Sequence, residues 1–258
     1  MPTLRALVAN ILFYANMVLW LIPALPILLG PRRWSLNAIR VWSHFTMWML
    51  AVTVGLRWEI RGLDNLPTRD GKQIGCIIAS KHQSHWETFG LFPYLYDPAY
   101  ILKKELLRLP GFGWFSARSG MIAVDRSRGS KALRDMTKAA KDAVDEGRQL
   151  IIFPEGTRRL VDAPPDYKPG AAHLYRQLGV PVVPAAINSG LFWPRRQFAR
   201  YPGTIVVSIL PAIPPGLESR DMLVTLQDAI ETETDKLVEE ARAAGTGAPP
   251  LPAEAVAG

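Results

Sequence analysis

The chain of 258 residues is 48% hydrophobic and carries a formal net charge of +7 at pH 7, with a pI near 9.7. This length suits one sizeable domain with an appendage, and the hydrophobic share allows a full core. The positive charge favours an anionic partner: a membrane surface, a phosphorylated substrate or nucleic acid. The single cysteine, Cys76, excludes an internal disulfide and a zinc cluster of several cysteines, and it fits a reducing compartment.

The N-terminus is expected to associate with a membrane. Residues 6–29 contain no charged side chain, and as one helix they would reach roughly 36 Å, enough for a hydrocarbon core of about 30 Å. Pro23 and Pro26 interrupt this run, so its unbroken part is at the lower limit for a span. A second apolar segment covers residues 41–56. Between the two segments lie three arginines, Arg32, Arg33 and Arg40.

Several arrangements of this segment remain open. If both helices spanned, the positive-inside tendency would hold the arginines in the cytoplasm and put the rest of the chain on the far side. We favour a hairpin within one leaflet, and a first helix that spans with a second along the interface is the alternative. A cleaved signal peptide and a buried soluble hairpin are the other readings. Tryptophans are frequent here and can form an interfacial belt or core, at positions Trp20, Trp34, Trp42 and Trp48.

From residue 57 onward the pattern alternates between strands and helices. Short buried strands are expected at residues 74–80, 99–102, 121–124, 150–153, 180–186 and 204–210. Helices are expected at residues 130–146, 167–178 and 220–243. We interpret Cys76 as a buried strand residue and not as a nucleophile.

The alternation predicts an α/β fold with a mostly parallel central sheet flanked by helices. This domain is placed at residues 61–243. It is preceded by an N-terminal membrane-embedded two-helix segment at residues 1–60 and followed by a disordered tail at residues 244–258.

Residues 80–89, Ser-Lys-His-Gln-Ser-His-Trp-Glu-Thr-Phe, directly follow an expected strand. Ser84 and Glu87 fit a capping box, so a helix is expected to begin at His85, with His82 in the turn before it. Across that turn Glu87 can hold one nitrogen of the His82 ring, which leaves the other nitrogen to take a proton from an alcohol. The alternative is that Glu87 only caps the helix. A zinc site on the two histidines is not favoured, because no further ligand stands at a usual spacing.

A second stretch, residues 150–159, runs from an apolar strand into Phe-Pro-Glu-Gly-Thr-Arg. Gly156 lets the backbone approach a ligand, and Thr157 and Arg158 supply a hydroxyl and a forked cation that suit a phosphate. Glu155 can bind a substrate hydroxyl or hold Arg158. The alternative is an ordinary turn with a surface ion pair.

Further cations stand at the ends of two other expected strands. Lys103 and Lys104 follow one strand, and Arg126 follows the next. Open α/β sheets bind ligands at their carboxyl edge. Each of these residues alone is typical of a surface cation, but together with Arg158 they predict an anion pocket.

Four blocks in this order resemble the lysophosphatidic acid acyltransferase family of glycerolipid acyltransferases. That family carries a His-x4-Asp block, a lysine-rich block ending in Asp-Arg, a Phe-Pro-Glu-Gly-Thr-Arg block and a later Val-Pro-x-x-Pro block. Here the blocks stand at residues 82–87, 103–126, 153–158 and 180–184. The acidic residue of the first block is Glu87 and not aspartate, which keeps the charge on a side chain one methylene longer.

The resemblance implies that His82 is the general base, oriented by Glu87, and that it deprotonates the sn-2 hydroxyl of lysophosphatidic acid. That hydroxyl would attack the thioester of acyl-CoA or acyl-ACP to give phosphatidic acid. The acceptor would be held by Lys103, Lys104, Arg126, Glu155, Gly156, Thr157 and Arg158. The resemblance implies no metal or redox cofactor. The apolar N-terminus predicts a membrane location without a nucleic acid partner, and the catalytic domain is expected to face the cytoplasm, where the acyl donors are.

Other functions remain open from the sequence. The acceptor can be a different lysolipid, or the chain can be a lipid-binding membrane protein without catalysis. A nucleic-acid binder rests on charge alone, without a recognised motif. A serine lipase rests on Ser84 and His85, which are too close in sequence to suggest a triad, and no G-x-S-x-G elbow is present.

Overall fold

The computed structural model describes residues 2–249, which form a seven-stranded sheet in the order β1-β9-β8-β4-β7-β5-β6. From β8 to β6 all neighbours are parallel, whereas β9 runs antiparallel to β8 and parallel to the edge strand β1. The strands are β1 (Leu56–Arg61), β4 (Cys76–Ser80), β5 (Pro98–Lys103), β6 (Ile122–Val124), β7 (Gln149–Ile152), β8 (Val182–Ile187) and β9 (Gly203–Ile209). The predicted α/β fold with a mostly parallel sheet is confirmed.

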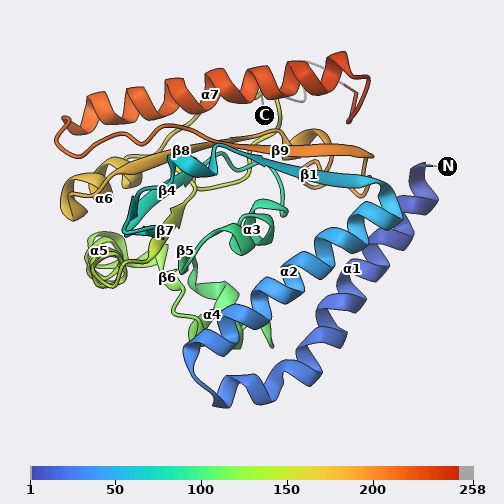
Figure 1. The fold of residues 1–258 in the computed structure, drawn as a ribbon, viewed down its shortest axis with the longest axis horizontal. Helices are drawn as coiled ribbons and strands as arrows, with labels where there is room; N and C mark the ends of the chain where they lie inside the picture. The colour runs from blue at the N-terminus through green and yellow to red at the C-terminus, as the bar shows by residue number, and fades with distance from the viewer. Residues whose placement is uncertain (1, 250–258) are drawn as a thin grey trace.

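Helices cover both faces of this sheet (Figure 1). On one face lie α5 (Gly129–Asp145), α6 (Gly170–Leu178) and α7 (Ser219–Ala243), and on the other lie α2 (Arg32–Val54) and the short α3 (Glu87–Gly90). The shorter elements are α4 (Phe112–Arg118), the hairpin of β2 (Thr68–Arg69) and β3 (Lys72–Gln73), and the 3-10 turns η1 (Leu25–Leu29), η2 (Leu63–Asn65), η3 (Phe92–Tyr94), η4 (Lys104–Arg108), η5 (Arg126–Arg128) and η6 (Ser189–Leu191).

The alternation of side chains along β4 divides the core into two layers. Ile77 and Ala79 join the cluster under α5, α6 and α7, whereas Cys76 and Ile78 join the cluster with α2 and α3. Both faces of the strand are therefore buried, as expected for a central parallel strand. Burial raises the pKa of the Cys76 thiol to about 12, which agrees with its interpretation as a buried strand residue.

The N-terminal segment folds as a helical hairpin of α1 (Pro2–Ala24) and α2, joined through η1 (Figure 1). The α2 helix begins at Arg32, directly after Pro31. The three arginines that were expected in the connector therefore lie on this helix. They hold the helix to the loop before β5. Arg32 pairs with Asp97, with its Nη1 2.8 Å from Oδ1, and Arg40 donates to the carbonyl of Leu95 at 3.0 Å.

The two helices differ in what they bury. The α2 helix buries nine side chains, including Met47 and Leu50, against the domain. Among the described residues, Leu4–Leu29 is the one helical stretch long and apolar enough to cross a membrane, and only 11% of its apolar window is buried. A soluble core helix would hide that surface, so the α1 side chains do not fit the buried soluble hairpin.

Several boundaries differ from the sequence-based expectations, among them the strand expected at 180–186, which begins at Val182, and the helix expected at 167–178, which begins at Gly170. The division at residue 60 falls inside β1, which escaped prediction because it is a half-exposed edge strand with alternating charges. The expected strand at 74–80 begins two residues later, at Cys76. Disorder is not seen at residues 244–249, where the amide of Ala248 donates to the carbonyl of Leu191 at 2.7 Å. Residues 250–258 of the expected tail lie outside the described residues.

Gly203 opens β9, which runs antiparallel to β8, so it lies near the carboxyl end of β8. Its φ is +143°, and a Cβ there would stand 2.3 Å from Cε1 of Phe192. We expect Gly203→Ala to lower the free energy of unfolding by about 1–3 kcal/mol through this overlap. Gly216→Ala is the matched control, because its φ is +112° but the space around it is open. Equal losses in chemical denaturation of the two variants would show that the overlap is relieved at no cost.

Candidate active site

The site lies where β4, β7 and β8 end at the same edge of the sheet. The turn after β4 carries His82, and the turn after β7 carries Glu155 and Arg158. A backbone hydrogen bond from the amide of Arg159 to the carbonyl of His82, 2.8 Å long, joins the two turns. The structure thus brings together the first and third sequence blocks, as predicted for a parallel sheet.

His82 is half-buried and stacks on the ring of Phe153, with centroids 4.0 Å apart and planes 19° apart. Its Nδ1 is buried without a hydrogen-bond partner among the described residues. Burial and then the charge of Arg158 lower its pKa to about 3, with smaller effects from His85 and Arg195. The imidazole is therefore neutral at physiological pH, the form that can accept a proton.

Glu87 has different partners from the one that the sequence suggested. Its carboxylate accepts from the amides of Gln83 and Ser84, from the Ser84 hydroxyl and from the Ser189 hydroxyl, at 2.7 to 3.1 Å. No hydrogen bond to the His82 ring is present in the described part of the chain. Only half of the predicted capping box forms: the Ser84 amide donates to the Glu87 carboxylate, but the Ser84 hydroxyl accepts from the amide of Trp86 and not from that of Glu87. The helix begins at Glu87 and not at His85, without a side-chain cap. Here Glu87 shapes the turn, because its carboxylate faces the amides of that turn.

Ser84 is 1% exposed, and its hydroxyl donates to Glu87 at 2.9 Å and accepts from the amide of Trp86 at 2.9 Å. A serine so enclosed does not fit a lipase nucleophile. His85, by contrast, is exposed and lies beside Trp193, with ring centroids 6.2 Å apart. Among the described residues, no group of three His, Cys, Asp or Glu side chains is placed to hold a metal.

Glu155 lies beneath the site in a buried ionic network. Its Oε1 is 2.9 Å from Nζ of Lys81, and its Oε2 accepts from the amide of His82 at 3.2 Å. Lys81 is also 2.8 Å from the carboxylate of Glu231 on α7, which accepts from the Tyr167 hydroxyl at 2.7 Å. Burial raises the pKa of Glu155, while Lys81 opposes that rise. Glu155 is buried and does not pair with Arg158 among the described residues. It joins the turn after β7 to the turn after β4 through Lys81 and the His82 amide.

Arg158 is half-buried and follows the turn that the amide of Gly156 closes by donating to the carbonyl of Phe153. The φ of Gly156 is +66°, a conformation that permits this sharp reversal. Burial lowers the pKa of Arg158, the charge of Glu87 opposes this, and Arg195 and Arg196 lower it further. Thr157 is exposed beside it.

The sequence reasoning missed the loop after β8. Arg195 donates to the carbonyl of Arg158 at 2.6 Å, and Arg200 is buried at 8% exposure with its guanidinium 4.3 Å from the Trp193 ring centre. The signal was available: Trp-Pro-Arg-Arg-Gln-Phe-Ala-Arg at 193–200 holds three arginines between the strands expected at 180–186 and 204–210. This segment lies beyond the four blocks that resemble the family.

The cations of the second block lie along the same edge of the sheet but away from His82. Lys103 and Lys104 are exposed, and Nζ of Lys104 is 3.3 Å from Asp125. The strand β7 separates β5 from β4 in the sheet order. No contact between these lysines and His82 is present in the described structure. The backbone of Arg126 begins η5, and its side chain lies outside the described parts.

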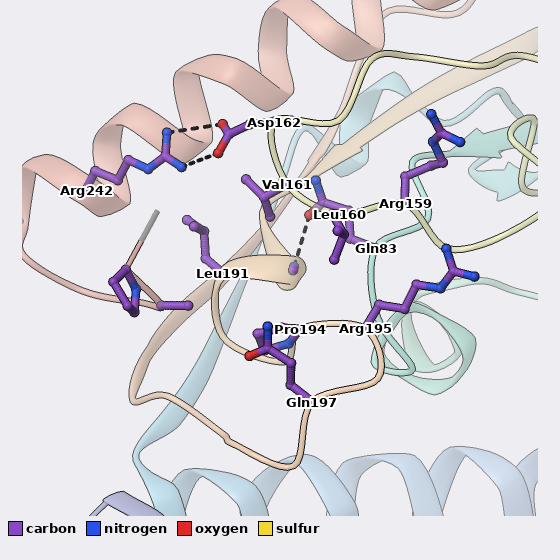
Figure 2. Close-up of a pocket in the computed structure, with 13 residues that line it drawn as sticks. Gln83, Arg159, Leu160, Val161, Asp162, Leu191, Pro194, Arg195, Gln197 and Arg242 are labelled. Atoms are coloured by element: carbon purple, nitrogen blue, oxygen red, sulfur yellow. Dashed lines mark hydrogen bonds and ion pairs between the residues drawn. The ribbon is translucent and has the colours of Figure 1, made fainter. Parts of the chain in front are cut away.

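A small pocket lies beside the turns that follow β4 and β7, with Gln83 of the first turn and Arg159 after the second in its wall (Figure 2). Its wall includes Gln83, whose Oε1 accepts from the amide of Gly190 at 3.0 Å, and Asp162, which Arg242 of α7 binds through two nitrogens. The enclosed space of about 20 Å³ fits water and not a lipid. Figure 2 shows Arg195 at the edge of this pocket, with its side chain directed away from the pair of Arg242 and Asp162.

Lys81 is expected to be essential for the stability of this edge. Lys81→Met leaves the carboxylates of Glu155 and Glu231 without their cation, so we expect the free energy of unfolding to fall by about 3–5 kcal/mol. Lys141→Met is the control, because Lys141 pairs with Asp145 on the exposed face of α5, and its loss should change stability by less than about 0.5 kcal/mol. Chemical denaturation of both variants in detergent measures the difference, and similar values would contradict the role of the network.

The low pKa of His82 predicts acid sensitivity of the fold. Its pKa falls from 6.5 to about 3 on folding, so the unfolded chain takes up a proton first as the pH drops. The neutral ring therefore contributes stability above pH 6.5, and this contribution is lost as the pH falls toward 3. We expect Tm to decline less steeply between pH 7 and pH 4.5 in His82→Gln than in the unchanged protein. An unchanged slope would argue that the ring is charged in the folded state.

Comparisons with known proteins agree with this architecture. A family model described as Acyltransferase matches residues 57–188. The crystal structure of the 1-acyl-sn-glycerophosphate (LPA) acyltransferase from Thermotoga maritima superposes with a TM-score of 0.77, covering 92% of this chain and 98% of that one, at 21% identity. At that identity the likeness is one of fold.

Two relatives are similar in sequence. The chain is 41% identical over 175 residues to the 1-acyl-sn-glycerol-3-phosphate acyltransferase of Pseudomonas aeruginosa, covering 68% of this chain and 66% of that protein. It is 34% identical over 171 residues to the human 1-acyl-sn-glycerol-3-phosphate acyltransferase beta, covering 65% and 60%. The matches thus span less than two thirds of these relatives' own lengths. Because the family model covers more than half of the chain and includes the turns of His82 and Arg158, the chain belongs to the acyltransferase family.

Proposed function

We propose that the chain transfers an acyl group from a thioester to the sn-2 hydroxyl of lysophosphatidic acid, giving phosphatidic acid. The observation that carries this proposal is the neutral, half-buried His82 held next to the turn of Arg158. A base that is uncharged at neutral pH and a cation for a phosphate are what this acceptor requires. The names of the relatives in Pseudomonas and in humans support this choice of acceptor.

In the proposed reaction His82 takes the proton of the sn-2 hydroxyl while the oxygen attacks the thioester carbonyl. The carbon–oxygen ester bond forms, the carbon–sulfur bond breaks, and the leaving thiolate receives the proton from His82. No acyl-enzyme intermediate is needed. The enclosed Ser84 supports direct transfer, because its hydroxyl is committed to Glu87 and to the amide of Trp86.

The surrounding residues are assigned supporting roles. Glu87 is a positioning residue, because its carboxylate gathers the amides of the turn that presents His82. Glu155 is likewise a positioning residue through Lys81 and the His82 amide. The acceptor itself is assigned to Arg158 with Gly156 and Thr157, and further cations of the same edge are Lys103, Lys104 and Arg126.

The membrane surface is the proposed place of reaction. Exposed apolar side chains run along α1, including Leu4, Ile11 and Leu19, and continue on α2 at Trp34 and Trp48. Such a surface suits insertion into one leaflet. The catalytic domain is proposed to face the cytoplasm, where a thioester such as acyl-CoA or acyl-ACP serves as donor.

The central test is thioester-dependent acylation by the detergent-purified protein. Lysolipids with and without a phosphomonoester headgroup are offered beside each other, with the unchanged protein and His82→Ala. We expect transfer to lysophosphatidic acid and a loss of at least about 100-fold in kcat for His82→Ala, because a general base contributes roughly 10²–10⁴-fold.

The outcomes separate the candidate functions. Transfer to another lysolipid alone keeps the mechanism and changes the acceptor. Activity retained in His82→Ala removes the role of this base. Absence of transfer to every lysolipid would favour a lipid-binding protein without catalysis, for which the exposed apolar helix already provides a surface.

A further inference from the structure

The loop between β8 and β9 is built around a buried arginine. The guanidinium of Arg200 donates through Nη1 to the carbonyls of Gln197, Phe198 and Ala199, and through Nη2 to Oδ1 of Asn10 on α1 at 2.7 Å. Its face lies over the Trp193 ring. These contacts give the loop one defined conformation, so the side chains that it presents are held in place before any ligand binds.

Arg195 is the side chain of this loop that contacts Arg158 at the candidate site. Its Nη1 donates to the carbonyl of Arg158 at 2.6 Å, so the loop after β8 contacts the turn after β7 directly. Arg195 is partly exposed and points away from the pocket interior (Figure 2). Because only one of its nitrogens is used in this contact, the remaining N–H groups are available to an anion.

The two arginines are like charges held together. Neither Arg158 nor Arg195 forms an ion pair with a carboxylate in the described part of the chain, and Arg195 lowers the pKa of Arg158. The charge of Arg195 also lowers the pKa of His82. Two cations that repel one another beside a proposed base form a site that an anion would stabilise.

The acceptor chemistry places a phosphate near the base. In lysophosphatidic acid one carbon and one oxygen separate the carbon that bears the hydroxyl from the phosphorus. A hydroxyl at His82 therefore keeps the phosphomonoester close to the cations beside that ring. The phosphates of an acyl donor lie much further from the reacting carbonyl, across the pantetheine arm.

We propose that Arg195 and Arg158 form a two-guanidinium clamp for the phosphomonoester of the acceptor, and that Arg195 thereby selects phosphorylated acceptors. This inference rests on the proposed acyl transfer for its ligand. Two forked cations suit a group with several acceptor oxygens and a charge near −2.

The test compares Arg195→Gln with Arg158→Gln and with Arg220→Gln. Arg220 is an exposed residue of α7 outside the site, so its variant controls for the loss of one positive charge from the protein. We expect the acceptor KM to rise roughly 10-fold to 100-fold in both site variants, since charge-assisted hydrogen bonds are lost. The thioester KM should change by less than about 2-fold, and Arg220→Gln should match the unchanged protein.

A soluble probe separates the clamp from catalysis. Glycerol 3-phosphate carries the phosphomonoester without an acyl chain, and its binding is measured by calorimetry. We expect Arg195→Gln to weaken this binding and Arg195→Lys, which keeps the charge but loses the fork, to weaken it less. Thermal unfolding of each variant verifies the fold, and Arg195→Lys carries the test if Arg195→Gln does not fold.

Each outcome bears on the clamp. Unchanged binding of glycerol 3-phosphate by Arg195→Gln overturns it, and so does a rise in thioester KM alone, which would assign the loop to the donor. If the unchanged protein acylates no lysophosphatidic acid yet binds glycerol 3-phosphate through Arg195, the clamp stands and the proposed function fails.

Discussion

The ion pair of Lys81 and Glu155 is the interaction on which the geometry of the active edge depends. Both side chains are buried, Lys81 at 2% and Glu155 at 1% exposure. Lys81 directly follows β4, and Glu155 lies in the turn after β7. Their contact therefore sets the distance between the two turns. A buried pair is costly to desolvate, and here that cost is offset by further hydrogen bonds to Glu231 and to the His82 amide. The turn that carries His82 is thereby also tied to α7.

The hydrophobic hairpin is packed against the site and is not a detached anchor. Phe13 of α1 meets Trp193 edge to face, with ring centroids 5.2 Å apart, and Asn10 accepts from Arg200. Within the hairpin, Asn16 donates to the Thr46 hydroxyl at 2.9 Å. Polar contacts in an apolar segment specify how the helices pair. The same helix that exposes apolar surface therefore contacts the loop that carries Arg195.

The sequence predicted those features that depend on local pattern. Strand positions, the long helices and the meeting of His82 with the turn of Arg158 follow from periodicity and from the rule that parallel strands share one carboxyl edge. The relation of Glu87 to His82 could not be read in this way. A capping carboxylate can turn toward the ring or toward the amides, and the amides of Gln83 and Ser84 together with Ser189, 102 residues away, decide it. The role of Lys81 could likewise not be predicted, because its partner Glu231 is 150 residues away in sequence and contacts it only in the fold.

Under the proposed function, the charges around His82 would link acceptor binding to the strength of the base. Burial and the charges of Arg158, His85 and Arg195 lower the pKa of His82 to about 3, so the ring is neutral but a weak base. A bound phosphomonoester would offset the charges of Arg158 and Arg195, and the pKa of His82 would rise toward the working pH. Proton transfer is most effective when those two values are close. The proposed base would thus gain strength when a phosphorylated acceptor is bound, whereas an acceptor lacking the phosphate would leave His82 in its weak state.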